Sequence, residues 1–352
     1  MNTMEAISWF CGLGGSALGA VLAGARVIAA IDYDDWMLAS HELNMRDVKA
    51  VNFDMQRLAK LDPSTIALAR DLLISFGIAN PNTWEGTHVF TAPCPGFSKG
   101  GRMNPNDPRN RLIFAMIPIL AATPKSRLIF ENVPTFLAEK YKDIHTELFN
   151  GIRELRGYEL DRHFLRRYVL YGPDYGLFQT RKRLIFPIMQ NGESFPNPPP
   201  KTVLDHRVFS DAFGPSFVDR DVRRPPMTRL EKRLVKYIEP GGDIRQGIER
   251  DWFVREYAEE NGLIGRSNLL KVASRNAPMQ TVVAKCGANI SRIETLHPDK
   301  RRFTHGEVRR AQGIPDKWVV LGSSAKAREM IGNAVPPVLL KNAFLSYIPK
   351  CD

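Results

Sequence analysis

The chain has 352 residues, 43% of them hydrophobic, and its 49 lysines and arginines against 38 acidic residues give a net charge of +11. This length suits a large domain with a smaller one. The basic excess favours a polyanionic partner such as nucleic acid, although basic proteins of other kinds share it. No apolar run approaches the roughly 18 residues of a membrane span, and the first residues lack the basic and apolar regions of a signal peptide. The four cysteines are scattered and resemble neither a disulfide framework nor a zinc site, which favours a reducing cytoplasm.

The first half of the sequence alternates short apolar runs with helical spacing. This alternation is typical of a parallel α/β sheet with buried strands. In such sheets ligands bind at the carboxyl ends of the strands, so the polar residues that follow each run are candidates for a site. The predicted elements in chain order are a strand at Ile7–Phe10, a helix at Ser16–Ala23, and strands at Val27–Ile31, His88–Ala92, Arg127–Phe130 and Leu184–Met189.

The composition changes after the last predicted strand. Asn191–Pro200 is a polar, proline-rich linker, and the sequence from there to about Lys300 is rich in Arg and Lys without a clear alternation of strands and helices. The α/β pattern resumes near Phe303. The sequence therefore predicts a catalytic, cofactor-binding domain over 1–190, a second domain over 191–300, and a return to the first domain over 301–352.

A glycine-rich loop links the first strand to the first helix. Gly12 and Gly14 begin a G-x-G-x-x-A pattern that ends at Ala17, and Asp32 follows 20 residues after Gly12. The glycines allow close approach of the backbone to a cofactor, and the acid can bind ribose hydroxyls. NAD and S-adenosylmethionine both carry an adenosine ribose, so the loop leaves both open, beside a tight turn that binds nothing. Asp54 could accept a hydrogen bond from an adenine amino group, or simply cap a surface turn.

A second loop contains a cysteine between two prolines. Pro93 and Pro95 disfavour the helical conformation of the residues before them, so Cys94 is expected on a stiff, extended loop at the end of a strand. An isolated cysteine is more often a small buried apolar residue. Positive charge, however, raises the thiolate fraction of a nearby thiol, which favours a reactive Cys94. The cations close to it in sequence are Lys99, Arg102, Arg109 and Arg111.

Gly96–Gly100 also matches the G-x-S-x-G pattern of serine hydrolases. That motif requires a strand directly before the serine and a helix directly after it. Ser98 instead follows two prolines and precedes a stretch rich in Gly, Asn and Pro. We therefore reject a serine hydrolase.

Six segments together resemble the motifs of the DNA cytosine-C5 methyltransferases, in the order that this family shows. They are Phe10-x-Gly12-x-Gly14-Gly15, Pro93-Cys94 with Phe97-Ser98, Glu131-Asn132-Val133, Gln179-Thr180-Arg181-Lys182-Arg183, Phe303-Thr304 through Glu307, Arg310, Gln312-Gly313 and Pro315, and Gly332-Asn333-Ala334-Val335-Pro336-Pro337. The sequence departs from the family pattern at Ser8, Pro95, Phe178 and Gly306, where an acid, a glutamine, a proline and an arginine are usual. None of these four positions carries a group that the chemistry needs.

The resemblance implies roles for individual residues. Cys94 is the expected nucleophile toward C6 of cytosine, and Glu131 is the expected acid near N3. Arg183 is expected to contact O2, with Arg181 steadying the loop or Cys94. Without the resemblance, Glu131 is a helix-start carboxylate, and the two arginines are surface cations that share one face of a strand. The remaining implied residues are Ser98 and Gln179 at the substrate, and Phe10, Gly12, Gly14, Gly15, Asp32, Asp54, Asn333 and Ala334 at the cofactor.

The resemblance also implies a fold, a cofactor and a partner. We expect a Rossmann-like α/β methyltransferase domain with a mostly parallel central sheet, a smaller target-recognition domain, S-adenosyl-L-methionine as cofactor, and no metal. The expected substrate is double-stranded DNA with the target cytosine flipped out, and Gly96–Arg111 is expected to close over it. The protein is expected to be a monomer that acts in the cytoplasm at the nucleoid, or in the host cytoplasm if viral, with a restriction endonuclease as a possible functional partner.

Two alternatives within the family stay open. They are a tRNA cytosine-C5 methyltransferase and a catalytically inactive DNA-binding relative, and the sizeable segment 191–300 favours DNA over tRNA. Some cations of this segment are expected to contact phosphates and a few to read bases, although a basic run is more often a solvated surface. These cations include Arg220, Arg223, Arg224, Arg229, Lys232, Arg233 and Lys236.

Overall fold

The computed structural model describes residues 4–98, 103–260, 262, 264, 270–284 and 295–348. Cys286 and Cys351 lie outside the described residues, as do the cations Lys99 and Arg102 and part of the predicted lid. The chain forms two compact units. Unit 1 comprises Met1–Tyr171, Lys182–Lys201 and Val335–Asp352, and unit 2 comprises Gly172–Arg181 and Thr202–Ala334.

A seven-stranded sheet forms the centre of unit 1, with strand order β3-β2-β1-β4-β5-β7-β6. Its strands are β1 (Glu5–Trp9), β2 (Arg26–Asp32), β3 (Lys49–Asn52), β4 (Thr87–Phe90), β5 (Arg127–Asn132), β6 (Val169–Tyr171) and β7 (Lys182–Ile188). The first five strands pair in parallel, whereas β7 runs antiparallel to both β5 and β6. The predicted α/β fold with a mostly parallel sheet is confirmed, and every predicted strand matches an observed one within two residues at either end.

Burial explains why the central strands could be predicted from the sequence. Almost every residue of β1, β4 and β5 is buried, and a strand buried on both faces has a continuous apolar run. The two strands that the sequence did not predict, β3 and β6, are short, lie at the two edges of the sheet and are only partly buried.

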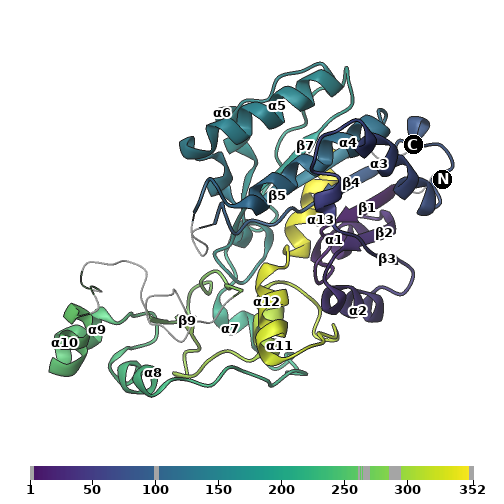
Figure 1. Ribbon diagram of the computed structural model, residues 1–352. Helices are drawn as coiled ribbons and strands as arrows, with labels where there is room; N and C mark the ends of the chain where they lie inside the picture. Colours follow the sequence, from purple (N-terminus) through teal and green to yellow (C-terminus); the bar gives the residue numbers. More distant parts are fainter. Residues whose placement is uncertain are drawn as a thin grey trace. The chain divides into compact units, whose positions relative to one another are not determined.

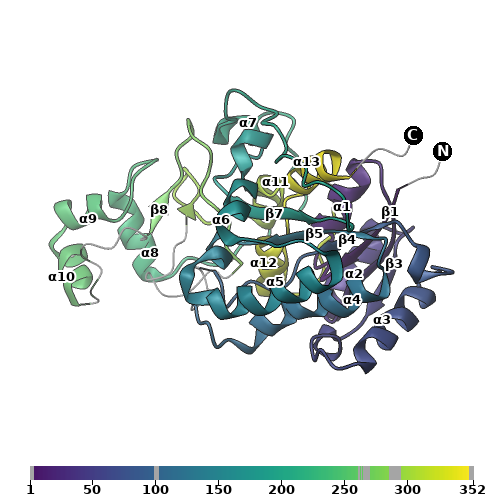
Figure 2. The same cartoon turned by 90° about the horizontal axis from the view of Figure 1, so that it is seen from above.

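Helices cover the sheet of unit 1 (Figures 1 and 2). The last helix of the chain packs against the first, and the packing is close because a Cβ on Gly19 would lie 2.8 Å from both Leu340 Cβ and Pro337 O. The third helix packs in turn against the fourth. The helices of unit 1 are α1 (Gly15–Leu22), α2 (Asp35–Asn44), α3 (Ser64–Ser75), α4 (Met116–Ala122), α5 (Lys142–Arg156), α6 (Arg162–Leu165) and α13 (Pro337–Tyr347).

The proline-rich segment after β7 belongs to unit 1. The Tyr168 hydroxyl donates a hydrogen bond of 2.7 Å to the carbonyl of Pro196, and Ser346 Oγ donates one of 3.1 Å to the carbonyl of Asn197. The segment that the sequence identified as a linker is therefore packed against α13 and the residues before β6.

The unit boundaries differ from the predicted limits of 190 and 300. The second part of unit 2 begins at Thr202 and continues to Ala334, and unit 2 also contains Gly172–Arg181. The segment Gly172–Arg181 pairs with residues about a hundred positions later in the chain, because the N–H of Thr180 donates to the carbonyl of Met279 at 2.8 Å. A pairing over such a sequence separation leaves no local pattern in the sequence.

In its described residues, unit 2 consists of short helices and two short strands. An apolar cluster that includes Leu234, Val254 and Leu296 forms a core for its central part. No helix of the described residues is long and apolar enough to cross a membrane. The elements are α7 (Phe209–Ala212), α8 (Arg229–Leu234), α9 (Arg245–Arg250), α10 (Trp252–Glu260), β8 (Lys271–Val272), β9 (Thr295–Leu296), α11 (His305–Ala311) and α12 (Ser324–Asn333).

Gly306 is one of the departures from the family pattern, and the structure shows what it allows. A Cβ at this position of α11 would lie 2.0 Å from Asp219 Oδ1. Asp219 accepts a hydrogen bond of 2.7 Å from Thr304 Oγ1, and the N–H of Gly306 donates to the carbonyl of Asp221 at 2.9 Å. The glycine therefore lets the chain around Asp219 lie directly against the start of α11.

Candidate active site

The glycine loop turns sharply between β1 and α1. Gly12 and Gly14 have φ angles of +52° and +94°, in the left-handed region that glycine adopts without strain. Phe10 also has a positive φ, of 57°, and its ring packs edge-on against Phe90 at 5.2 Å. The N–H of Gly12 donates to Asp32 Oδ2 at 2.9 Å, so the end of β2 holds the loop in place.

The Asp32 carboxylate is buried at the end of β2. It also accepts hydrogen bonds from the N–H groups of Tyr33 and Asp34, at 2.8 and 3.1 Å. Burial raises the pKa of Asp32, and the backbone hydrogen bonds partly offset that rise. A carboxylate offers about four acceptor positions, so these bonds leave capacity for a further donor such as a ribose hydroxyl. The next residue, Tyr33, is 67% exposed, which is unusual for a large aromatic side chain.

Asp54 lies near the end of the neighbouring strand. The N–H of Phe53 donates to the carbonyl of Asp32 at 2.9 Å, which joins the ends of β2 and β3. Asp54 Oδ1 accepts a hydrogen bond of 2.9 Å from the N–H of Gln56 and so caps the short 3-10 helix Met55–Arg57. The two acids therefore lie at adjacent strand ends, and the capping role considered from the sequence is present.

Gly15 contacts the last sequence motif. A Cβ on this residue would lie 2.1 Å from the carbonyl oxygen of Val335. No real side chain tolerates that distance, so the position requires glycine. Beside it, the buried hydroxyls of Ser8 and Ser16 are 2.9 Å apart. A pair of hydroxyls thus occupies the place where the family usually has an acid.

The backbone carbonyls of the cysteine loop accept hydrogen bonds from within the loop and from two side-chain hydroxyls outside it. The N–H groups of Phe97 and Ser98 donate to the carbonyl of Cys94, at 3.0 and 2.9 Å, and form a tight turn. The Tyr141 hydroxyl donates to the carbonyl of Gly96 at 2.7 Å. Thr135 Oγ1 donates to the carbonyl of Phe97 at 2.6 Å. The loop is therefore held rigidly by residues that follow β5.

The thiol of Cys94 is partly exposed and lies near a guanidinium. Hydrogen bonding to Asp107 raises the pKa of Arg109, and the charges of Asp107, Tyr33 and Cys94 raise it further. Cys11 has the opposite surroundings, because burial raises the pKa of its thiol well above the usual range and the charge of Asp32 adds to the rise. Of these two cysteines, only Cys94 combines exposure with a nearby cation.

Glu131 and Arg183 come together across the antiparallel pair β5 and β7. Arg183 Nε lies 2.8 Å from Glu131 Oε1, and the two side chains are only 11% and 7% exposed. Arg183 also donates Nη1 to the carbonyl of Lys182 at 2.8 Å. At the end of β5, Asn132 Nδ2 donates to the carbonyl of Ala92 at 3.3 Å. The cysteine loop thus follows β4, and the ion pair lies on β5 and β7, the next two strands of the same sheet.

Arg181 has a different environment. The alternative interpretation made it a surface cation on the same strand face as Arg183, but β7 begins at Lys182, so the alternation along a strand does not apply to it. Its guanidinium is buried and donates hydrogen bonds of 3.0 to 3.2 Å to three carbonyls of unit 2. These carbonyls belong to Val282, Gly332 and Ala334.

Gln179 is also completely buried within unit 2. Its amide nitrogen donates to the carbonyl of Ala311 and to Gln312 Oε1, each at 2.8 Å, and its amide oxygen accepts from the N–H of Val282 at 2.9 Å. The amide is thus occupied by the protein, which favours a positioning role over the expected contact with substrate. Asn333, by contrast, is exposed at the last position of α12.

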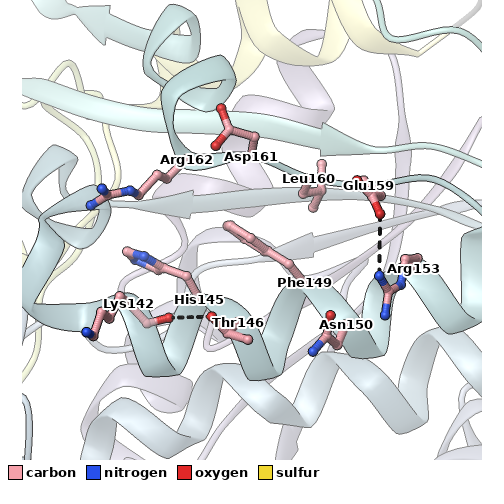
Figure 3. Close-up of a pocket in the computed structure, with 10 residues that line it drawn as sticks. All are labelled: Lys142, His145, Thr146, Phe149, Asn150, Arg153, Glu159, Leu160, Asp161 and Arg162. Atoms are coloured by element: carbon pink, nitrogen blue, oxygen red, sulfur yellow. Dashed lines mark hydrogen bonds and ion pairs between the residues drawn. The ribbon is translucent and has the colours of Figure 1, made fainter.

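A surface cavity of about 320 Å³ lies elsewhere on unit 1, between α5 and Glu159–Arg162 (Figure 3). His145 and Phe149 stack along it with ring centroids 5.7 Å apart, and Arg153 bonds to Glu159 at 3.4 Å. None of the predicted site residues lines this cavity, so we do not assign the chemistry to it.

Sequence reasoning missed two residues of interest. Tyr33 was not singled out, although an exposed aromatic residue directly after an acid at a strand end is visible in the sequence. Gln312 was noted only as part of a motif. Its amide nitrogen donates to the carbonyl of Ile331 at 2.9 Å while its oxygen accepts from Gln179, which joins three distant segments. No pattern in the sequence identifies such a pairing.

Curated relatives match the chain over nearly its full length. It is 23% identical over 341 residues to the type II methyltransferase M1.HphI of Haemophilus parahaemolyticus, covering 95% of this chain and 83% of that protein. It is 27% identical over 350 residues to the type II methyltransferase M.NgoPII of Neisseria gonorrhoeae, covering 95% and 92%.

Solved structures share the fold. A putative DNA modification methyltransferase encoded within an Escherichia coli prophage matches with a TM-score of 0.62 and 22% identity over 97% of both chains. The Entamoeba histolytica methyltransferase EhMeth matches with a TM-score of 0.60 and 12% identity over 97% of both chains. The sequence model of the protein family "C-5 cytosine-specific DNA methylase" matches residues 4–348. The resemblance seen in the motifs is therefore confirmed, and the chain belongs to the C-5 cytosine-specific DNA methylase family, an enzyme family that uses S-adenosylmethionine.

Proposed function

We propose that this DNA cytosine-5 methyltransferase acts through a covalent bond between Cys94 Sγ and C6 of a cytosine flipped out of duplex DNA. The observation that carries this proposal is the partly exposed Cys94, which lies near Arg109. Cys94 follows β4, the neighbour of the strand β5 on which Glu131 pairs with Arg183. A cytosine within a duplex cannot reach a thiol on a loop, so the base must leave the stack at a cost of a few kcal/mol.

The thiolate is needed because C5 of an aromatic cytosine is a poor nucleophile. Addition of Cys94 to C6 breaks the aromaticity and places electron density on C5, while N3 takes up a proton. Covalent catalysis of this kind divides one difficult step into two easier ones. After C5 has been methylated, loss of its proton to a base expels Cys94, and return of the N3 proton to the group that supplied it restores the neutral aromatic ring.

Glu131 and Arg183 are proposed to act on the opposite edge of the base. Glu131, when protonated, delivers the proton to N3. Arg183 holds this carboxyl through Nε and Lys182 O through Nη1, and we propose that Nη2 donates to O2 of the cytosine. Ser98, within the turn after Cys94, is proposed to contact the substrate as well.

The residues of the glycine loop fit S-adenosylmethionine. Asp32 keeps acceptor capacity for the ribose hydroxyls, and the exposed ring of Tyr33 offers an apolar face to the adenine. We propose that Asp54 accepts from the adenine amino group. Phe10, Gly12, Gly14 and Gly15 of the glycine loop are proposed to contact the cofactor, and Asn333 and Ala334 are proposed as further cofactor contacts. When bound, the cofactor supplies the methyl group for C5.

Four finer properties belong to this proposal. The relatives are named type II methyltransferases, which supports a restriction endonuclease as functional partner. We also propose that the protein acts as a monomer, in the cytoplasm, where chromosomal DNA is accessible. Unit 2, which contains most of the predicted domain 191–300 but begins its main part at Thr202 and continues to Ala334, is proposed to recognise the target sequence.

Methyl transfer from labelled S-adenosylmethionine to duplex DNA and to tRNA tests the function. We expect label in duplex DNA only, at a fixed sequence that bisulfite sequencing of DNA from a methylation-free host would reveal. Label in tRNA alone would contradict the proposal in favour of the RNA-modifying branch. Binding of DNA without any transfer would identify an inactive relative.

A further inference from the structure

The helix α8 and the turn that follows it are strongly amphipathic. Leu230, Leu234 and Val235 face the apolar core of unit 2. The opposite side of α8 carries cations at positions i, i+3 and i+4, which is the spacing of one helix face, and one more cation follows in the 3-10 turn Val235–Tyr237. These exposed cations are Arg229, Lys232, Arg233 and Lys236, and we call them the α8 cation face.

The one acid of α8 does not compensate this face, because it points inward. Glu231 lies 2.6 Å from Arg302, and the two side chains are 5% and 3% exposed. Glu231 also accepts a hydrogen bond of 2.7 Å from the N–H of Thr228 and so completes the helix cap. The ion pair anchors the inner side of the helix and leaves the outer side with positive charge only.

One member of the α8 cation face has a partner on the protein. Arg233 lies over the Phe253 ring at 3.6 Å and 4.0 Å from Asp251. For Arg229, Lys232 and Lys236 there is no ion pair within the described part of the chain. Three exposed and uncompensated cations on one short face favour an anionic partner rather than an intramolecular role.

The neighbouring helices have the opposite character. A surface hollow of about 510 Å³ at α9 and α10 is lined by Arg250 and Arg255 together with four carboxylates. The acids are Glu249, Asp251, Glu256 and Glu259. The excess of acidic side chains there disfavours binding of a polyanion. Arg250 and Arg255 are therefore useful controls, because they are exposed like the cations of α8 but lie among carboxylates.

We propose that the α8 cation face contacts the phosphate backbone of the DNA duplex and fixes its position on unit 2. This inference rests on the proposed function. The stretch from Arg229 to Lys236 is about 10 Å long at 1.5 Å per residue. Along the duplex axis, one strand carries a phosphate about every 3.4 Å, so this length corresponds to on the order of three phosphates. Side chains that contact phosphates set position and carry no direct sequence information.

A matched pair of double variants of the full chain tests the inference. Arg229→Gln with Lys232→Gln removes two charges from the α8 cation face, and Arg250→Gln with Arg255→Gln removes two from the acidic hollow. Affinity for duplex DNA is measured by fluorescence anisotropy over a salt series, with target and unrelated sequences. We expect the first variant to lower the slope of log K against log salt by about 2, equally for both sequences, and the second to leave it near the wild-type value.

Each other outcome overturns this inference. Equal slopes for the two variants would show that α8 is not a specific contact surface. A loss confined to the target sequence would identify base reading instead of backbone contact. If wild-type protein neither binds nor methylates DNA, the proposed function fails. If the wild type does both and the α8 variant matches it, only this inference fails. Unchanged thermal unfolding of both variants shows that the fold is retained.

Discussion

Glu131 and Arg183 form a buried ion pair across β5 and β7, with Oε1 and Nε 2.8 Å apart. Removal of one partner from such a pair leaves an uncompensated buried charge and costs about 3–5 kcal/mol of stability. The proposed acid, Glu131, is therefore held in position by a cation, Arg183. Substitutions that keep the shape of the pair therefore test chemistry more cleanly than truncations do.

Glu131→Gln keeps an acceptor for Arg183 but cannot deliver a proton in the same way. We expect the rate of methyl transfer to fall by roughly 10²–10⁴, the usual loss for a positioned acid, while DNA affinity stays within a few-fold. Single-turnover kinetics with labelled cofactor measure the rate. Methylation at a near-normal rate would show that Glu131 is structural.

Arg109 is expected to support the thiolate form of Cys94. Arg109→Gln removes a positive charge that interacts with Cys94, so the thiolate fraction falls and the pH–rate profile moves to higher pH. Arg111 is the matched control, since it pairs with Glu147 at 2.6 Å and lies over the Phe114 ring at 4.2 Å. Equal shifts for Arg109→Gln and Arg111→Gln would argue against a specific effect on Cys94.

Gly306→Ala tests the close approach at the start of α11. A Cβ 2.0 Å from Asp219 Oδ1 forces a displacement, and we expect a loss of about 1–3 kcal/mol in the free energy of unfolding. In an Asp219→Ala background the clash is absent, and alanine is the better helix former by up to about 1 kcal/mol. The same substitution should then be neutral or stabilising. A loss of equal size in both backgrounds would contradict this account.

His41 should make the protein sensitive to acid. It is completely buried in α2, neither ring nitrogen has a hydrogen-bond partner among the described residues, and burial lowers its pKa to about 4. Because the unfolded chain binds the proton with a pKa near 6.5, stability is complete above that pH and falls as the pH drops toward 4. The loss is about 1.4 kcal/mol per pH unit.

His41→Leu should remove this contribution. Denaturant unfolding near pH 7 and near pH 5 measures it, and we expect the variant to lose about 2 kcal/mol less than the wild type between the two. The measurement near pH 7 is the internal control, where the variant should be at least as stable. An identical loss in both proteins would show that His41 does not titrate as described.

The sequence predicted the strands of unit 1 that are buried on both faces, such as β1 and β5, because such strands have a continuous apolar run. It did not predict β3 and β6, which are short edge strands, or the antiparallel direction of β7. Direction depends on how the chain returns to the sheet, and no residue of Lys182–Ile188 encodes that. The assignment of 172–181 to unit 2 was missed for a similar reason, since its partners lie about a hundred residues further along the chain.

For the site, the motifs led to the correct family, and the structure adds contacts that the motifs cannot contain. In the register of β5 and β7, Glu131 lies opposite Ile185, so its ion pair with Arg183, two residues away on β7, is a diagonal cross-strand contact. The burial of Gln179 and Arg181 depends on carbonyl groups of unit 2, and a backbone carbonyl has no sequence pattern. Local motifs therefore identified the groups, while long-range pairing decides which of them are available for chemistry.

Cys94 is the nucleophile of the proposed mechanism, and trapping with 5-fluorocytosine DNA tests this assignment directly. Fluorine at C5 cannot be eliminated as a proton, so the adduct persists and can be mapped by mass spectrometry of the digested protein. We predict one cofactor-dependent adduct, at Cys94, in the wild type, and none in Cys94→Ala, which should still bind DNA. An adduct at Cys11, Cys286 or Cys351, or an adduct that persists in Cys94→Ala, would contradict the account.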